Sequence, residues 1–85
     1  MDNKLELFKK KLIYRAGYRG TKEMDILLST FVNKHIHSFD ENLLIELEKF
    51  LNFEDEIILN FYNKNIVEKE IDKNKISKLF INFKL

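Results

Sequence analysis

The feature of this chain that most restricts its fold is the spacing of its apolar residues, which recur every three or four positions along nearly the whole sequence. This spacing gathers apolar side chains on one side of an α-helix, whereas a half-buried strand would show alternation. The sequence contains no proline, so the helix ends must be set by glycine and by capping side chains. The pattern predicts an all-α protein, a compact bundle of about five short helices.

The apolar stripes place the individual helices. The first helix begins near Leu5 and ends at Ala16, and the two glycines of the chain, Gly17 and Gly20, follow it. A residue with positive φ often closes the last turn of a helix, and glycine adopts that conformation without strain. Further stripes run over residues 24–35, 43–51 and 57–62.

Capping residues mark where the later helices begin. Ser38 and Asp40 are equally good caps for the third helix, and Asn52 is expected both to end that helix and to cap the fourth. Asp72 is expected to cap a last helix over about residues 72–83.

Length and composition restrict the class of protein. With 85 residues and no cysteine, we expect one helical domain, residues 1–85, without disulfides or thiolate metal ligands. Its 15 basic and 14 acidic residues give a net charge of +1, too little for a field that attracts nucleic acid or an anionic membrane. No apolar run could span a bilayer, and the N-terminal residues show no signal or transit pattern. We therefore expect a bacterial cytoplasmic protein without membrane insertion.

Side chains suited to catalysis or metal binding are scarce. The two histidines, His35 and His37, would point in different directions on a helix, and a metal site would need a third ligand. No serine has the glycine flanks of a nucleophile elbow. The carboxylates of Glu23 and Asp25 are offset by two residues in a domain too small to enclose a substrate. The sequence predicts a protein that is not an enzyme and has no metal site.

The segment from Tyr14 to Asp25 carries more polar side chains than folding requires, with Arg19, Gly20, Glu23 and Asp25 gathered at the first helix junction. These residues fit a protein-binding surface, because Arg and Tyr are favoured interface anchors and mixed charge sets specificity. They fit a local role equally well. In that role Gly20 closes a helix, the acids favour the next helix start, and Arg19 pairs with one of them at the surface.

A nucleic-acid-binding surface is a third interpretation of this region, with Tyr14 and Tyr18 as stacking faces. The basic residues of the stripe would be Lys9, Lys10, Lys11, Arg15, Arg19 and Lys22. Neighbouring acids would repel phosphate, and a solvated helix face explains the lysines as well. We therefore expect no nucleic-acid partner.

The junction resembles the signature of the succinate dehydrogenase assembly factor family, small helical factors that promote flavinylation. The hallmark of that family is an Arg-Gly dipeptide followed by Glu three residues and Asp five residues after the glycine. Arg19, Gly20, Glu23 and Asp25 occupy these positions. The order of elements also agrees, and the similarity extends over about residues 8–62.

The chain departs from the family pattern in two places. Where the family usually has a proline in an acidic connection and then a tryptophan or similar aromatic residue, this chain reads Phe53-Glu54-Asp55-Glu56-Ile57. The tail from Ile66 matches weakly, so no functional role is carried onto it.

The resemblance implies an assembly chaperone that binds the flavoprotein subunit of succinate dehydrogenase, with fumarate reductase as a further client, while FAD becomes attached to a histidine of that subunit. It implies partner-binding roles for Arg15, Arg19, Gly20, Glu23 and Asp25, with Gly20 permitting close approach of two backbones. FAD belongs to the partner, so we expect no tightly bound cofactor here, and we expect the free chain to be a monomer. The alternative is a helical adaptor or regulator of another protein.

Overall fold

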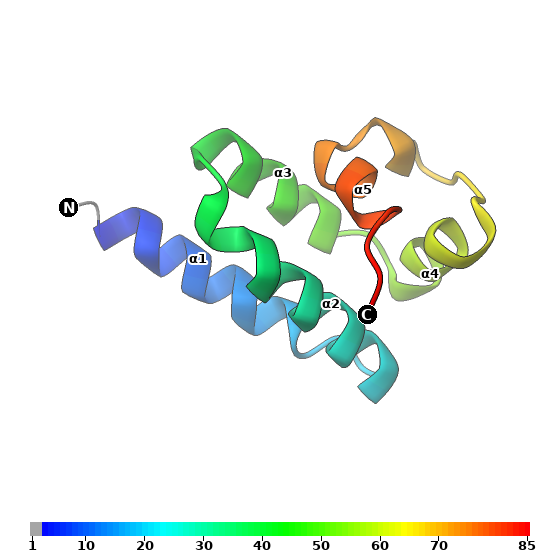
Figure 1. The fold of residues 1–85 in the computed structure, drawn as a ribbon, viewed down its shortest axis with the longest axis horizontal. Helices are drawn as coiled ribbons and strands as arrows, with labels where there is room; N and C mark the ends of the chain where they lie inside the picture. The colour runs from blue at the N-terminus through cyan, green and yellow to red at the C-terminus, as the bar shows by residue number, and fades with distance from the viewer. Residues whose placement is uncertain (1–2) are drawn as a thin grey trace.

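The computed structural model describes residues 3–85. Their regular structure consists of five α-helices and two short 3₁₀ helices, and no strand occurs among them. In chain order the elements are α1 (Asn3–Ala16), α2 (Lys22–His35), the 3₁₀ helix η1 (Ile36–Ser38), α3 (Glu41–Leu51), α4 (Asp55–Lys64), the 3₁₀ helix η2 (Ile71–Lys73) and α5 (Lys75–Phe80). The predicted all-α bundle is confirmed (Figure 1). None of the described helices is both long enough and apolar enough to cross a membrane.

Side-chain caps define the starts of α2 and α3. At the start of α2, Thr21 Oγ1 accepts a hydrogen bond from the Met24 N–H (3.2 Å). At the start of α3, Asp40 Oδ1 accepts a hydrogen bond from the Leu43 N–H (2.9 Å). Of the two candidate caps for α3, Asp40 is therefore the cap, whereas the Ser38 hydroxyl donates back to a carbonyl of the preceding helix.

Two of the predicted caps were wrong. Asn52 ends α3, as predicted, but α4 begins after Glu54, which makes no side-chain capping hydrogen bond. The last helix is capped by Asn74, whose Oδ1 accepts hydrogen bonds from two backbone N–H groups at 2.8 and 3.1 Å, and not by Asp72, which lies in η2. The side-chain amide of Asn74 also donates to the Glu46 carbonyl in α3 (3.0 Å). This contact between distant segments positions Asn74, so α5 begins at Lys75 and not near Asp72.

Three phenylalanines from three helices form the centre of the core. Phe31 on α2, Phe50 on α3 and Phe80 on α5 are fully buried. The ring centroids of Phe31 and Phe80 lie 5.1 Å apart in an edge-to-face arrangement, and those of Phe50 and Phe80 lie 5.2 Å apart. Aromatic pairs at such distances stabilise a fold beyond the burial of their area. The last helix is therefore part of the core.

The segment after α5 runs between α2 and α4 (Figure 1). The Phe83 ring is buried 5.3 Å from the ring of Phe31, and the Phe83 carbonyl accepts a hydrogen bond from the Tyr62 hydroxyl (2.6 Å). On the opposite side of α2, helix α1 packs against α2 and α3 along its inner face, where Leu12 and Ala16 are buried. Its outer face remains open to solvent.

Candidate functional site at the first helix junction

A tight turn over residues 17–21 joins α1 to α2. The Gly17 N–H donates to two carbonyls in the last turn of α1, at 3.1 and 3.3 Å. Gly20 has a φ of +121°, a conformation that L side chains rarely adopt. The predicted positive φ is therefore present in the turn, but at Gly20 and not at Gly17, the residue that closes the last turn of α1. A Cβ built on Gly20 would have room, because its nearest neighbour, Asp55 Oδ2, would lie 4.0 Å away. Backbone conformation, and not lack of space, is therefore what requires glycine here.

Arg19 turns its side chain into the molecule and binds the connection between α3 and α4. Its Nε donates to Asp55 Oδ1 (2.8 Å), and its two terminal nitrogens donate to the carbonyls of Leu51 (2.6 Å) and Phe53 (2.7 Å). Only 10% of this side chain is exposed. A planar guanidinium can donate from three separate nitrogens to three acceptors, whereas the three donors of a lysine all belong to one nitrogen. Arg19 therefore fixes the first helix junction against the second half of the chain.

Asp25 holds the same turn from the other side. Its Oδ1 accepts a hydrogen bond from the backbone N–H of Arg19 at 2.5 Å, and the side chain is half-buried on the first turn of α2. The expected surface pair between the Arg19 guanidinium and Glu23 or Asp25 does not form. That guanidinium pairs with Asp55, 36 residues further along the chain, because the packing of α3 and α4 brings a carboxylate and two free carbonyls to it.

The other three predicted site residues take different positions. Arg15 is half-buried, and its guanidinium donates to Asn52 Oδ1 at the end of α3 (2.6 Å). Gly20 and Glu23 are exposed. The Glu23 carboxylate forms no salt bridge within residues 3–85. The structure thus brings all five residues to one junction, but the side chains of Arg15, Arg19 and Asp25 form hydrogen bonds within the protein.

Four consecutive exposed residues form what we call the turn surface: Gly20, Thr21, Lys22 and Glu23. It combines the exposed backbone of Gly20 with the cationic side chain of Lys22 and the anionic side chain of Glu23. Because Arg19 and Asp25 hold it from behind, this surface keeps one shape without the help of a partner. Such preorganisation lowers the entropic cost of binding.

Sequence reasoning did not link Asp55 to the junction. The acidic segment Glu54-Asp55 was noticed only as part of a resemblance, and no local pattern relates it to Arg19. The predicted basic stripe is also divided by the fold. Lys9 is nearly buried beside Glu6, with Nζ and Oε1 3.7 Å apart, while Lys10, the next residue of α1, is exposed.

The histidines do not form a metal site. His35 is half-buried with its ring centroid 5.0 Å from that of Phe31, and His37 is exposed. In the described part of the chain, no group of three or more His, Cys, Asp or Glu side chains is arranged to hold a metal ion.

Comparison with known protein families gives this geometry a context. Residues 10–84 match the family described as "Flavinator of succinate dehydrogenase". The chain belongs to this family. The match includes the junction and the whole segment from α2 to the end of α5, so it extends beyond the resemblance recognised over residues 8–62.

Curated members of the family show similar local sequence. The "Succinate dehydrogenase assembly factor 2-B, mitochondrial" of Drosophila simulans and that of Drosophila melanogaster are each 41% identical over 51 residues, which are 60% of this chain and 33% of each relative. The "Succinate dehydrogenase assembly factor 2, mitochondrial" of Drosophila virilis is 41% identical over 51 residues, 60% of this chain and 32% of the relative. The chain therefore spans about a third of the length of the curated relatives it matches. No solved structure matches it significantly.

The names of these relatives correct one prediction. We expected a bacterial cytoplasmic protein, but the similar proteins are named as mitochondrial. The expectation was wrong, and the relatives point to a mitochondrial protein.

Proposed function

We propose that this protein assists the assembly of succinate dehydrogenase by binding its flavoprotein subunit and promoting covalent attachment of FAD to that subunit. The observation that carries the proposal is the junction of a flavinator-family chain, in which Arg19 and Asp25 hold an exposed turn surface in one fixed shape. The curated relatives are named as succinate dehydrogenase assembly factors. Fumarate reductase, a related flavoenzyme, is a further candidate client.

In this proposal the turn surface makes the contact, and the buried side chains position it. Glu23 offers an unpaired carboxylate to a cationic or N–H group of the client, and such charge-assisted hydrogen bonds are the stronger ones. Gly20 presents backbone without a side chain, so the client backbone can approach closely. Arg19 and Asp25 act as positioning residues, because their side chains are hydrogen-bonded within the protein, and Arg15 helps to position the end of α3 through one hydrogen bond to Asn52 Oδ1.

The protein supplies geometry and no reacting group. FAD and the acceptor histidine both belong to the client, and a helper that favours the client conformation in which they are aligned makes the attachment effectively intramolecular. The chain therefore acts as an assembly factor and not as an enzyme, binds no FAD tightly itself, and is a monomer when free. A helical adaptor for another client remains the competing function, and the following experiment separates the two.

The test is covalent flavin fluorescence of the flavoprotein subunit in a denaturing gel, after expression with and without this protein. We expect fluorescence to depend on the protein and to fall at least about tenfold with Glu23→Ala, a loss of about 1.4 kcal/mol in the interaction. Glu41→Ala is the matched control, because Glu41 is also an exposed acid in the first turn of a helix, α3, away from the junction. Equal fluorescence in the presence and absence of the protein would reject the proposal in favour of an adaptor.

A further inference from the structure

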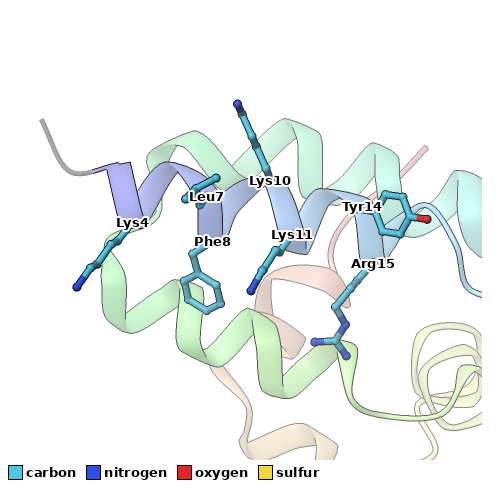
Figure 2. A pocket seen from close by; sticks show the side chains of 7 residues that line it. All are labelled: Lys4, Leu7, Phe8, Lys10, Lys11, Tyr14 and Arg15. Atoms are coloured by element: carbon cyan, nitrogen blue, oxygen red, sulfur yellow. The ribbon is translucent and has the colours of Figure 1, made fainter.

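An open groove runs along the outer face of α1, from Lys4 near its start to Arg15 near its end. Its volume is about 690 Å³. Leu7, Phe8 and Tyr14 supply its apolar part, and basic side chains, among them Lys10 and Lys11, border it (Figure 2). Phe8 and Lys11 project to one side of the helix and Lys10 to the other (Figure 2).

The apolar part of this groove is unusually exposed for a small folded protein. In the groove lining, Leu7 is 59% exposed and Tyr14 64%; Tyr18, which lies outside the lining, is 71% exposed. Apart from the C-terminal residue, these are the highest values for large apolar side chains among residues 3–85. The rings of Tyr14 and Tyr18 stack with their centroids 4.4 Å apart. Contiguous exposed apolar surface bordered by polar groups marks an interaction site, and paired aromatic rings lose little entropy on binding.

The charge around the groove has one sign. Helix α1 carries five basic residues and one acid, Glu6, and the Glu6 carboxylate pairs with Lys9 on the inner side. Neither Lys10 nor Lys11 forms a salt bridge within residues 3–85. The net charge of +1 for the whole chain conceals this local excess. Lys11 and Arg15 lie four positions apart, a spacing at which like charges on a helix repel one another, and an anionic partner would relieve that repulsion.

We propose that the outer face of α1 binds an acidic segment of a partner protein, one that carries apolar side chains beside its carboxylates. The apolar side chains fill the groove at Leu7 and Phe8, and the carboxylates meet Lys10, Lys11 and Arg15. Within residues 3–85 the Arg15 guanidinium donates one hydrogen bond, to the neutral amide oxygen of Asn52, so it retains donors for a carboxylate.

The observations favour a protein over nucleic acid as the occupant. Leu7 and Phe8 offer apolar contact that a sugar-phosphate backbone cannot use. Tyr14 and Tyr18 stack on each other, which covers one face of each ring that a base would need.

The test is titration with synthetic peptides, followed through backbone amide NMR signals. One helical peptide carries leucines on one face with glutamates beside them, a second has lysine at every glutamate position, and an oligothymidine represents nucleic acid. We expect the acidic peptide to shift signals of Leu7, Lys10 and Tyr14 at concentrations up to about 1 mM. Because no flavoprotein subunit is used, the outcome is independent of the proposed function.

Charge and apolar contact are then tested separately with variants of the full chain. Lys10→Glu/Lys11→Glu should raise the Kd of the acidic peptide at least about tenfold. The control variant Lys64→Glu/Lys78→Glu makes the same change in net charge on exposed residues of α4 and α5. Its Kd for the acidic peptide should stay within about twofold of the wild-type value. Leu7→Ala should raise the Kd of the acidic peptide about threefold or more, because apolar contact area is lost.

Three results would overturn the proposal. One is the absence of shifts on α1 with the acidic peptide. Another is equal binding of that peptide by the two charge variants, or equal shifts from the lysine peptide. The third is tighter binding of the oligothymidine, which would make the groove a nucleic-acid surface.

Discussion

The buried side of the first helix junction and the outer face of α1 use basic side chains in opposite ways. Arg19 is 10% exposed and meets one carboxylate and two carbonyls of the chain itself, whereas Lys10 and Lys11 are exposed and meet no carboxylate in the described residues. The residue type does not decide which role a cation takes. The decisive factor is whether packing brings acceptors to it, since a buried charge is tolerated only when it is paired and hydrogen-bonded.

The largest effect should come from removing the buried cation. Arg19→Ala leaves Asp55 and the carbonyls of Leu51 and Phe53 without their donor, and we expect the free energy of unfolding to fall by about 2–4 kcal/mol, measured by urea denaturation. Lys10→Ala, the exposed counterpart, should change it by less than about 0.5 kcal/mol.

Arg19→Lys sharpens the same comparison. It retains the charge but cannot reach three acceptors in one plane, so its stability should lie between those of the wild type and Arg19→Ala. If Arg19→Ala lowers the free energy of unfolding by less than about 1 kcal/mol, water replaces the guanidinium readily. The buried side of the first helix junction and the outer face of α1 would then differ less in stability than the contacts indicate.

The next largest effect should come from Gly20→Ala. A side chain at a φ of +121° strains the backbone, and we expect a loss of about 1–2 kcal/mol in thermal or urea unfolding. Gly17→Ala is the matched control within the same turn. A Cβ at position 17 would meet only ordinary contacts at 3.7 and 3.8 Å. The free energy of unfolding of Gly17→Ala should therefore equal or slightly exceed that of the wild type. Equal losses at both glycines would show that crowding, and not φ, is responsible.

Glu23→Ala should separate stability from binding. Glu23 is exposed and forms no salt bridge within residues 3–85, so the free energy of unfolding should change by less than about 0.5 kcal/mol while flavin attachment in the client falls. A clear loss of stability with flavin attachment intact would instead assign Glu23 to the start of α2 and remove it from the turn surface.

The smallest effect on stability should come from Lys10→Ala/Lys11→Ala. Removing two like charges from one helix should leave the midpoint of urea unfolding unchanged or raise the stability by up to about 0.5 kcal/mol. The effect should shrink in high salt, because exposed charges are screened. A loss above about 1 kcal/mol would show that these lysines support the fold, and the contrast with Arg19 would fail.

Much of the fold could be predicted because it follows from local spacing. The apolar stripes gave α1 to α4 nearly to their ends, and Asp40 could be recognised as one of two possible caps. The last helix was harder, because Asn74 competes with Asp72 as a cap and its advantage is a hydrogen bond to Glu46, on α3. No pattern among neighbouring residues predicts that contact, because Asn74 and Glu46 lie far apart in the sequence.

The candidate site shows the same limit. The sequence located the junction and its five residues, but it assigned Arg19 to the surface. The acceptors of Arg19 lie 32 to 36 residues away, and only the packing of the helices brings them together. The same packing turned Lys9 inward and left its neighbour Lys10 outside.

By itself the sequence determined the helical class, the glycine turn and the place where polar groups collect, because helix periodicity, positive φ and capping depend on residues within a few positions of one another. The tertiary structure alone decided which charges are satisfied internally and which face solvent. The physical reason is that burial and hydrogen bonding depend on acceptors supplied by distant segments, which meet Arg19 but not Lys10 or Lys11 when the helices pack.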